Sequence, residues 1–261
     1  MSKDAQVVLP PLDSWRVQFL RLTSFPGPEK LPGSTNWWLE SAGEEPESTT
    51  VRAKEGLQVQ EGPVENGSLR LTVGPLRIDW VLGPPPPDES DPSPRMDVGP
   101  LPATLGAFRG MLKRWLSSST CPHSARLAFG AVLMQPAETL TYAYSLLADY
   151  LVDSVRIDPA KSRDLLYRIN RCRPSRSIPD HRIINRLNTW SVLMIKRFLV
   201  PVLGEANPKV VSLSQGPLLQ LELDINTQDD ADAPMPQELL PTAFDELADL
   251  GCEIATRGDI P

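Results

Sequence analysis

Hydrophobic and polar side chains alternate in several short stretches of the chain, which is typical of strands that bury one face. Near the N-terminus, Trp15, Val17 and Phe19 alternate in this way. Asn66-Gly67 precedes another such stretch and predicts a hairpin turn, because both residues tolerate the positive φ of a type I′ turn. The remaining predicted strands lie near 69–73, 76–82, 126–134, 164–172, 182–200 and 209–226.

Three other stretches repeat their hydrophobic positions every three to four residues and predict amphipathic helices. Pro136 and Glu138 suit the start of the second helix, since proline is tolerated in the first turn and an acid favours the positive end of the helix dipole. The three apolar stripes are Leu105, Phe108, Leu112, Trp115 and Leu116; Leu140, Tyr144, Leu147 and Leu151; and Phe244, Leu247, Leu250 and Ile254.

The chain resembles itself at several places in the same order, which indicates a diverged tandem duplication. SWRVQF (14–19) resembles SARLAF (124–129), and SLRLTVGPLRIDW (68–80) resembles SLSQGPLLQLELD (212–224). Each member of the second pair precedes an acidic, proline-containing linker and a helix that begins with LPATLGAF or LPTAF. The alternative is that strand, turn and helix patterns recur by chance in any α+β protein.

The sequence therefore predicts an α+β fold with two antiparallel-sheet halves, each roughly β-α-β(3-4)-α, whose helices pack on one face. The N-terminal half spans 1–120 and holds a proline-rich acidic linker at 83–103; the C-terminal half spans 121–261. The C-terminal half contains a basic hairpin at 164–200 and an acidic linker at 227–238. This layout is similar to that of TBP-like tandem folds, a resemblance of topology that implies no functional residue.

Charge is distributed unevenly along the chain, whose net charge is −7. Residues 161–200 hold ten Lys and Arg against two acids, whereas residues 201–261 hold two against twelve. Such neighbouring segments either neutralise each other or face different partners. The 28 prolines gather between the predicted elements, so they mark connections and do not indicate a disordered protein.

Three widely spaced cysteines, Cys121, Cys172 and Cys252, fit neither a disulfide framework nor a zinc motif. Cys121 lies close to His123, but in a predicted loop, where an ordinary structural role is expected. The N-terminal residues lack the apolar core of a signal peptide, and no apolar run approaches the roughly 18 residues of a membrane span. We therefore expect a cytoplasmic protein of bacterial type, with no cofactor, no metal and no membrane contact.

Catalytic signatures are scarce: the sequence contains no GxGxxG, GxxxxGK[ST], GxSxG or HExxH motif. The two histidines, His123 and His181, are too few for a histidine-based metal or acid–base site. Three carboxylates, Asp79, Glu222 and Asp224, are weak candidates for a metal-dependent or acid–base hydrolase, which requires them to converge. The alternative is that these acids pair with basic neighbours.

The segment 167–190 contains six arginines: Arg168, Arg171, Arg173, Arg176, Arg182 and Arg186. One interpretation is that they dock an acidic protein partner or are merely solvated. A second is that Glu222 and Asp224 neutralise some of them across strands, which leaves the loop arginines Arg171, Arg173 and Arg176 free. A third is that the guanidinium groups bind phosphate while Trp190 stacks on a base.

Trp37-Trp38 is an aromatic pair that either packs against the core or anchors an interface. The absence of catalytic signatures and the segregated charge favour a non-catalytic binding or adaptor subunit of a larger protein assembly. Such a subunit would dock its partner through the arginine-rich hairpin loop or the cleft between the two halves. The alternatives are a nucleic-acid or nucleotide-phosphate binding module that uses the same arginines, and the carboxylate hydrolase.

Overall fold

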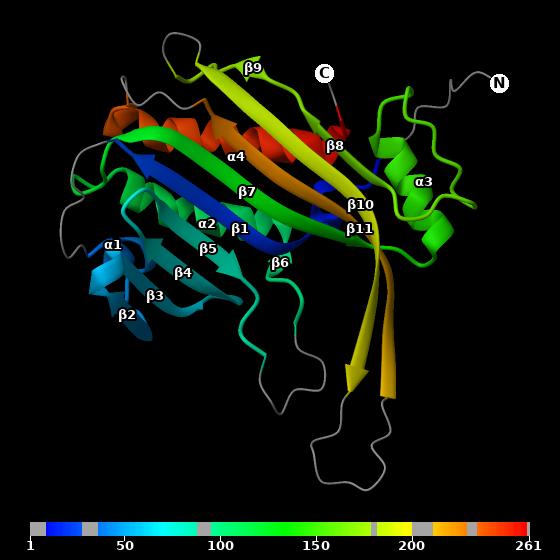
Figure 1. The fold of residues 1–261 in the computed structure, drawn as a ribbon, viewed down its shortest axis with the longest axis horizontal. Coiled ribbons are helices and arrows are strands. Elements are labelled where there is room, and N and C mark those ends of the chain that lie inside the picture. Colours follow the sequence, from blue (N-terminus) through cyan, green and yellow to red (C-terminus); the bar gives the residue numbers. More distant parts are fainter. Residues whose placement is uncertain are drawn as a thin grey trace, which may run out of the picture.

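The computed structural model describes residues 9–27, 36–87, 95–178, 182–199, 211–228 and 234–259. In these residues the strands form one 11-stranded antiparallel sheet in the order β2-β3-β4-β5-β1-β7-β11-β10-β8, with β6 beside β1 and β9 beside β10 (Figure 1). The predicted α+β class and antiparallel sheet are confirmed.

The strands are β1 (Arg16–Pro26), β2 (Ser48–Arg52), β3 (Leu57–Val64), β4 (Gly67–Val73), β5 (Ile78–Gly83), β6 (Gly99–Pro100), β7 (Ser124–Pro136), β8 (Leu166–Asn170), β9 (Arg173–Pro174), β10 (Ile183–Leu199) and β11 (Val211–Thr227). The helices are α1 (Trp37–Ala42), α2 (Leu101–Leu116), α3 (Leu140–Tyr150) and α4 (Leu240–Arg257). Short 3₁₀ turns cover Leu12–Ser14, Ala53–Glu55 and Gln237–Leu239. The sequence analysis did not predict β2 and β3.

The long helices α2 and α4 lie on the same face of the sheet, behind the strands in Figure 1. α2 packs on β1, and α4 packs on β7 and β11. The buried side chains of these elements form one hydrophobic core between helices and sheet. None of the helices in the described ranges is long and apolar enough to cross a membrane.

Pairing between β1 and β7 joins the strands of the two predicted halves into one continuous sheet. β1 pairs with β5 along one edge and with β7 along the other, so Leu20 lies between Leu82 and Ala131. Two separate sheets would leave the long strands β1 and β7 as open edges, whereas their pairing satisfies the backbone hydrogen bonds of both.

The alternation predicted at the N-terminus holds for Trp15 and Val17, which are fully buried, but is wrong for Phe19. The register between β1 and β7 shifts between Val17 and Phe19. A bulge of this kind moves the following side chains to the other face. Leu20 and Leu22 therefore enter the core, and Phe19 lies on the face that no described helix covers.

The predicted hairpin turn is present, one residue earlier than expected. Val64 pairs with Gly67, so Glu65 and Asn66 form the turn between β3 and β4. Glu65 has a φ of 45°, a left-handed value that is uncommon outside glycine and asparagine. Gly67 is required for a different reason, because a Cβ there would lie 2.7 Å from the carbonyl oxygen of Gly83.

Candidate functional site

Arg171 forms the best-defined ion pair of the basic segment, and its partner is an acid beyond the end of α4. Its Nε and Nη2 atoms donate to the Asp259 carboxylate at 2.9 and 2.8 Å, and the Tyr167 hydroxyl donates to it at 2.6 Å. The Asp259 side chain is fully buried. Burial acts to raise the pKa of Asp259, but the hydrogen bonds from Arg171 and Tyr167 outweigh it and hold that pKa below its ordinary value.

Other arginines of this segment also have contacts within the chain. Arg173 lies 3.6 Å from Glu253 of α4, and Arg182 donates to the carbonyl oxygen of Ala125 at 3.2 Å. Arg186 is 3% exposed, and burial lowers the pKa of its guanidinium group. The prediction that Arg171 and Arg173 remain without internal partners is therefore wrong.

The predicted pairing with Glu222 and Asp224 is wrong for Arg186, because successive residues of a strand face opposite ways. Arg186 pairs across β10 and β11 with Ile225, which is fully buried, whereas Asp224 pairs with Leu187. Arg186 and Asp224 thus lie on opposite faces of the sheet. The acids that pair with Arg171 and Arg173 come from α4 and the residues after it, whereas Arg168 lies on the same face as Glu222 and Asp224 and lines one hollow with them. Arg168 and Arg176 are exposed.

Glu246 of α4 holds the loop that follows β9. Its carboxylate accepts hydrogen bonds from the Ser175 and Ser177 hydroxyls, both at 2.6 Å, and from the Arg176 and Ser177 amides at 2.8 and 3.0 Å. Burial acts to raise the pKa of Glu246, but these four bonds outweigh it, so the pKa lies below its ordinary value.

Acidification should therefore loosen this loop. A carboxyl group whose pKa is lowered by folding contributes stability above its unfolded pKa of about 4, and that contribution is lost as the pH falls through the lower folded value. We expect hydrogen exchange at the Arg176 and Ser177 amides to accelerate on acidification, after correction for intrinsic rates. Glu246→Gln should show fast exchange already at pH 7. Equal protection in Glu246→Gln and wild type at pH 7 would contradict this role.

The three tryptophans selected as binding candidates are core residues. Trp37 and Trp190 are fully buried and Trp38 is 2% exposed. Trp190 stacks on Tyr150 with ring centroids 5.0 Å apart, and Trp37 contacts Trp115 edge-on at 5.7 Å. These rings are unavailable to a base or a partner surface, so the packing interpretation holds for Trp37 and Trp38, and the prediction that Trp190 stacks on a base is wrong.

The three candidate carboxylates do not converge. Asp79 lies on β5 and is separated from β11 by β1 and β7, a distance of about 14 Å at the usual strand spacing. Asp79 accepts a hydrogen bond from Thr23 at 2.7 Å and pairs with Arg77 at 2.8 Å. No group of three or more potential ligands capable of holding a metal occurs in the described ranges. This geometry disfavours the carboxylate hydrolase.

Cys121 has no features of a reactive thiol. It is 4% exposed, and its burial, aided by the charge of Glu40, raises its pKa to about 12. Because the thiolate is the nucleophilic form, this thiol is unreactive at neutral pH. The structural role expected from its loop position is consistent with this environment.

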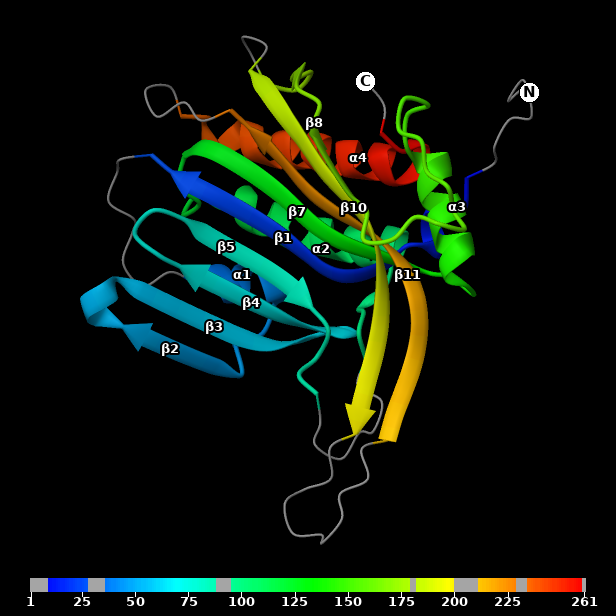
Figure 2. The same ribbon diagram turned by 45° about the vertical axis from the view of Figure 1, so that its right-hand side comes forward.

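The largest feature without a predicted role is a two-stranded extension of the sheet, which we call the arm: residues 192–199 of β10 and 211–216 of β11. In the described part of the chain, β8 pairs with β10 only at 187–191 and β7 pairs with β11 only at 218–226, so residues 192–199 pair only with β11 and residues 211–216 only with β10. The arm projects from the body in both ribbon views (Figures 1 and 2).

A bulge lies within the arm. The register of β10 and β11 shifts after the pair Ile195–Gly216, and Gly216 has a φ of 90°, which glycine adopts without strain. The feature of the sequence that indicates the arm is the length of its two strands. β10 and β11 have 17 residues each, about three times the usual five or six.

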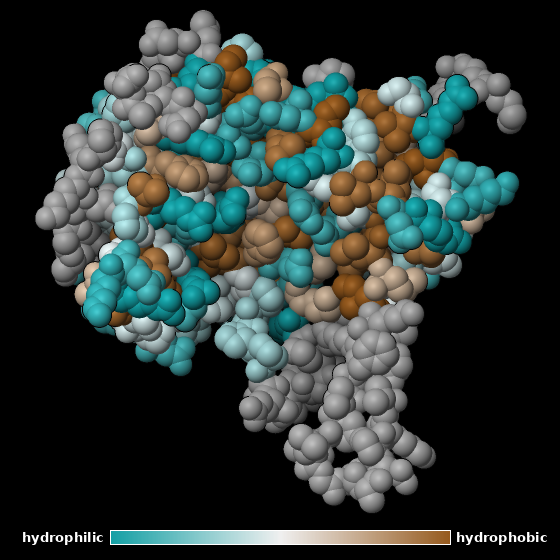
Figure 3. Space-filling model, viewed as in Figure 1, coloured by the Kyte–Doolittle hydropathy of each residue, from teal (hydrophilic) through white to brown (hydrophobic). Residues whose placement is uncertain are grey.

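A shallow hollow of about 360 Å³ on the helix-free face extends from β1 across β7, β11 and β10 to β8, and we call it the junction hollow. Phe19 and Val132 contribute apolar surface. The charged lining residues are Arg21, Arg168, Glu222 and Asp224. The Arg21 guanidinium lies across Gly130, where a Cβ would be 3.2 Å from its Nε. Figure 3 shows that apolar and polar side chains are mixed over this face.

Comparison with known proteins supplies no family for this chain: no protein-family model matches the sequence, and no curated protein matches it at a significant level. Function is therefore argued from the arm, the junction hollow and the internal contacts of the arginines.

Proposed function

We propose that this chain is a non-catalytic binding or adaptor subunit that docks a protein partner through the arm. The observation that carries the proposal is a ribbon of two strands that leaves the sheet and pairs with nothing else in the described chain. Eight residues of strand reach roughly 25 Å. An isolated two-stranded ribbon is at best marginally stable in water, so a partner that adds further contacts would stabilise it.

The chemical character of the arm suits a protein partner. Leu193 and Met194 are 38% and 46% exposed, although both are large apolar side chains. The outer edges of both arm strands carry backbone donors and acceptors that no neighbouring strand in the described ranges satisfies. A partner strand added to either edge would satisfy these groups, and a partner that also covers the ribbon would bury Leu193 on one face and Met194 on the other.

The proposed duplication shows which strands of the first half correspond to the arm strands. Outward from the β1–β7 pair, the order β1-β5-β4-β3 is matched by β7-β11-β10-β8, which supports related halves at 1–120 and 121–261. In the first half, β4 turns back at Gly74 to form β5, whereas β10 and β11 continue past Gly216. The arm is then an extension specific to the second half. The junction hollow, which extends from β1 of the first half across the strands of the second half, offers a second contact surface.

The nucleic-acid alternative is weaker than this proposal. Arg171 and Arg173 are held by acids of the same chain, and Trp190 is buried. Arg168 and Arg176 remain exposed. A stable phosphate-binding surface normally uses more cationic contacts than two.

The arm proposal predicts that Leu193→Ser/Met194→Ser loses its protein partner without unfolding. The tagged variant is purified from its native host beside wild type and Leu76→Ser, and bound protein and nucleic acid are both quantified. Leu76 is a matched control because it is 81% exposed and lies in the β4–β5 turn, away from the arm. Since all three side chains are exposed, we expect each variant to unfold within about 0.5 kcal/mol of wild type.

The expected result is a stoichiometric protein partner with wild type and Leu76→Ser that falls at least about tenfold in the arm variant, a loss of about 1.4 kcal/mol in binding. Equal recovery of that partner by all three proteins would overturn the proposal. Nucleic acid that is lost on Arg168→Ala/Arg176→Ala would support the alternative instead.

A further inference from the structure

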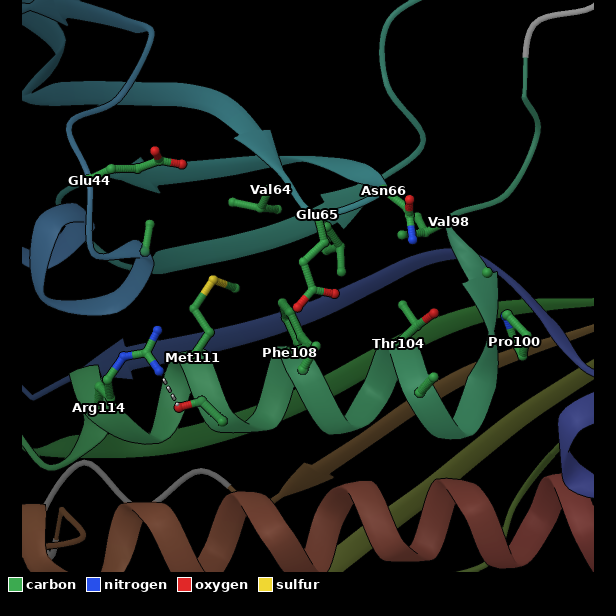
Figure 4. Close-up of a pocket in the computed structure, with 16 residues that line it drawn as sticks. Glu44, Val64, Glu65, Asn66, Val98, Pro100, Thr104, Phe108, Met111 and Arg114 are labelled. Carbon is green, nitrogen blue, oxygen red and sulfur yellow. Dashed lines mark hydrogen bonds between the residues drawn. The ribbon is translucent and has the colours of Figure 1, made fainter.

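A second cavity, separate from the arm and the junction hollow, opens on the helix side of the sheet. It lies between the β3–β4 turn and α2 and has a volume of about 570 Å³, within the usual range for small-molecule sites. We call it the hairpin pocket. Figure 4 shows Glu65 and Asn66 of the turn facing Thr104 and Phe108 of α2 across it.

The cavity exists because α2 carries small residues on the side that faces the turn. Ala103, Ala107 and Gly110 line the pocket at helical spacing, beside the buried stripe of α2, and their small size leaves room next to the turn. A Cβ added at Gly110 would meet no heavy atom within 4 Å. The space is therefore left open by the sequence and is not demanded by close packing of the backbone.

Thr104 supplies a polar group with no protein partner. Its side chain points toward the pocket in Figure 4, and the residue is only 7% exposed. Among the described residues the Thr104 hydroxyl takes part in no hydrogen bond, and its oxygen is not one of the buried atoms left without a partner, so it is accessible from the pocket. A ligand in the pocket can therefore hydrogen-bond to it without displacing a protein partner.

The charges around the pocket favour a cation. Glu44 and Glu65 line it, and neither forms an ion pair with the described residues. The single lining cation, Arg114, is held at the end of the pocket away from Asn66, where it donates to the carbonyl oxygens of Ser41 and Gly110. Phe108 and Met111 provide an apolar floor next to these polar groups.

We propose that the hairpin pocket binds a small organic amine, with a primary ammonium group on an apolar body. An ammonium group has three donors, which match the Glu65 carboxylate, the Asn66 amide oxygen and the Thr104 hydroxyl at one end of the pocket. The apolar body lies on Phe108 and Met111. This site is independent of the arm, so either proposal can fail without the other.

Benzylamine is a suitable probe, with benzoate and benzyl alcohol as matched anionic and neutral controls. We expect benzylamine to shift the backbone amide NMR signals of Glu65, Asn66 and Thr104 saturably, with a Kd of about 1 mM for so small a ligand. The same concentrations of benzoate should leave these signals in place, and benzyl alcohol should bind more weakly than benzylamine.

Single-residue variants test which side chains of the pocket contact benzylamine. Glu65→Gln should weaken benzylamine binding about tenfold and Thr104→Val about fivefold, as expected for lost hydrogen bonds to a charged group. Ala107→Leu should abolish binding by filling the pocket. Glu61→Gln is the control, because Glu61 lies on β3 but pairs with Arg70 on the opposite face of the sheet.

The proposal is overturned if benzylamine shifts none of these amides, if benzoate binds equally well, or if Glu65→Gln and Glu61→Gln bind alike. The NMR spectrum of each variant also reports whether it is folded. If Glu65→Gln fails to fold, Thr104→Val tests the polar contacts in its place. If Ala107→Leu fails to fold, Ala107→Met is used to fill the pocket.

Discussion

Gly258→Ala should lower the free energy of unfolding by roughly 3–5 kcal/mol, the range of severe single substitutions. Gly258 follows α4 with φ 79° and ψ −159°, a region of backbone conformation that only glycine adopts readily. A Cβ there would lie 2.1 Å from the carbonyl oxygen of Tyr150 and 2.8 Å from its carbon. Backbone atoms cannot move aside as a flexible side chain can, so the end of α4 must separate from α3.

The measurement is thermal and urea unfolding of Gly258→Ala beside Gly106→Ala. We expect Gly258→Ala to melt roughly 10 °C below wild type. Gly106 lies in the middle of α2, where a Cβ would meet no heavy atom within 4 Å, so alanine should stabilise the protein there by about 0.5–1 kcal/mol. A melting temperature of Gly258→Ala within a degree of wild type would contradict the structure at the end of α4.

Arg171→Met should destabilise the protein by about 3 kcal/mol, because it leaves the buried Asp259 carboxylate without its cation. The Asp259 side chain is fully buried and its amide donates to the carbonyl oxygen of Tyr150 at 2.8 Å, so it cannot turn to solvent without breaking that anchor. Adding Asp259→Asn removes the unpaired buried charge, so the double variant should recover part of the lost free energy of unfolding. Urea unfolding at pH 7 measures all three proteins.

An exposed ion pair provides the control for this prediction. Arg70 pairs with Glu61 at 3.1 Å, and both side chains are about half exposed, so Arg70→Met should change the free energy of unfolding by less than about 1 kcal/mol. If Arg171→Met and Arg70→Met proved equally mild, the contact with Asp259 would contribute no more than a surface pair. In that case Arg171 would again be a candidate for binding an external partner.

The local elements could be predicted because they depend on short-range periodicity. The strand at 126–134 and the stripe of Leu105, Phe108 and Leu112 need only the pattern of neighbouring residues, and both occur as expected in β7 and α2. The pairing of β1 with β7 joins residues about 110 positions apart, and no local pattern encodes it. One bulge near Val17 also reversed the face of every following residue in β1.

The site was harder to predict than the fold, since charge composition does not reveal which partners meet. The basic segment and the acidic C-terminal part meet, as the charge reversal suggested, through the pairs Arg171–Asp259 and Arg173–Glu253. Which acid an arginine can reach depends on the face of the sheet that its side chain occupies. Arg186 lies on the same face as Ile225, and Asp224 lies on the other. Trp190 stands among the arginines in sequence yet is fully buried, because alternate strand residues face opposite ways.

The central claim is that the arm contacts a protein partner, and site-specific photo-crosslinking in the native host tests it most directly. A benzophenone amino acid replaces Met194 in one protein and Leu76 in another, and both are irradiated at equal expression. The proposal predicts a discrete protein adduct from position 194 that is absent from position 76. The absence of any adduct at position 194, or the same set of adducts from both positions, would contradict it.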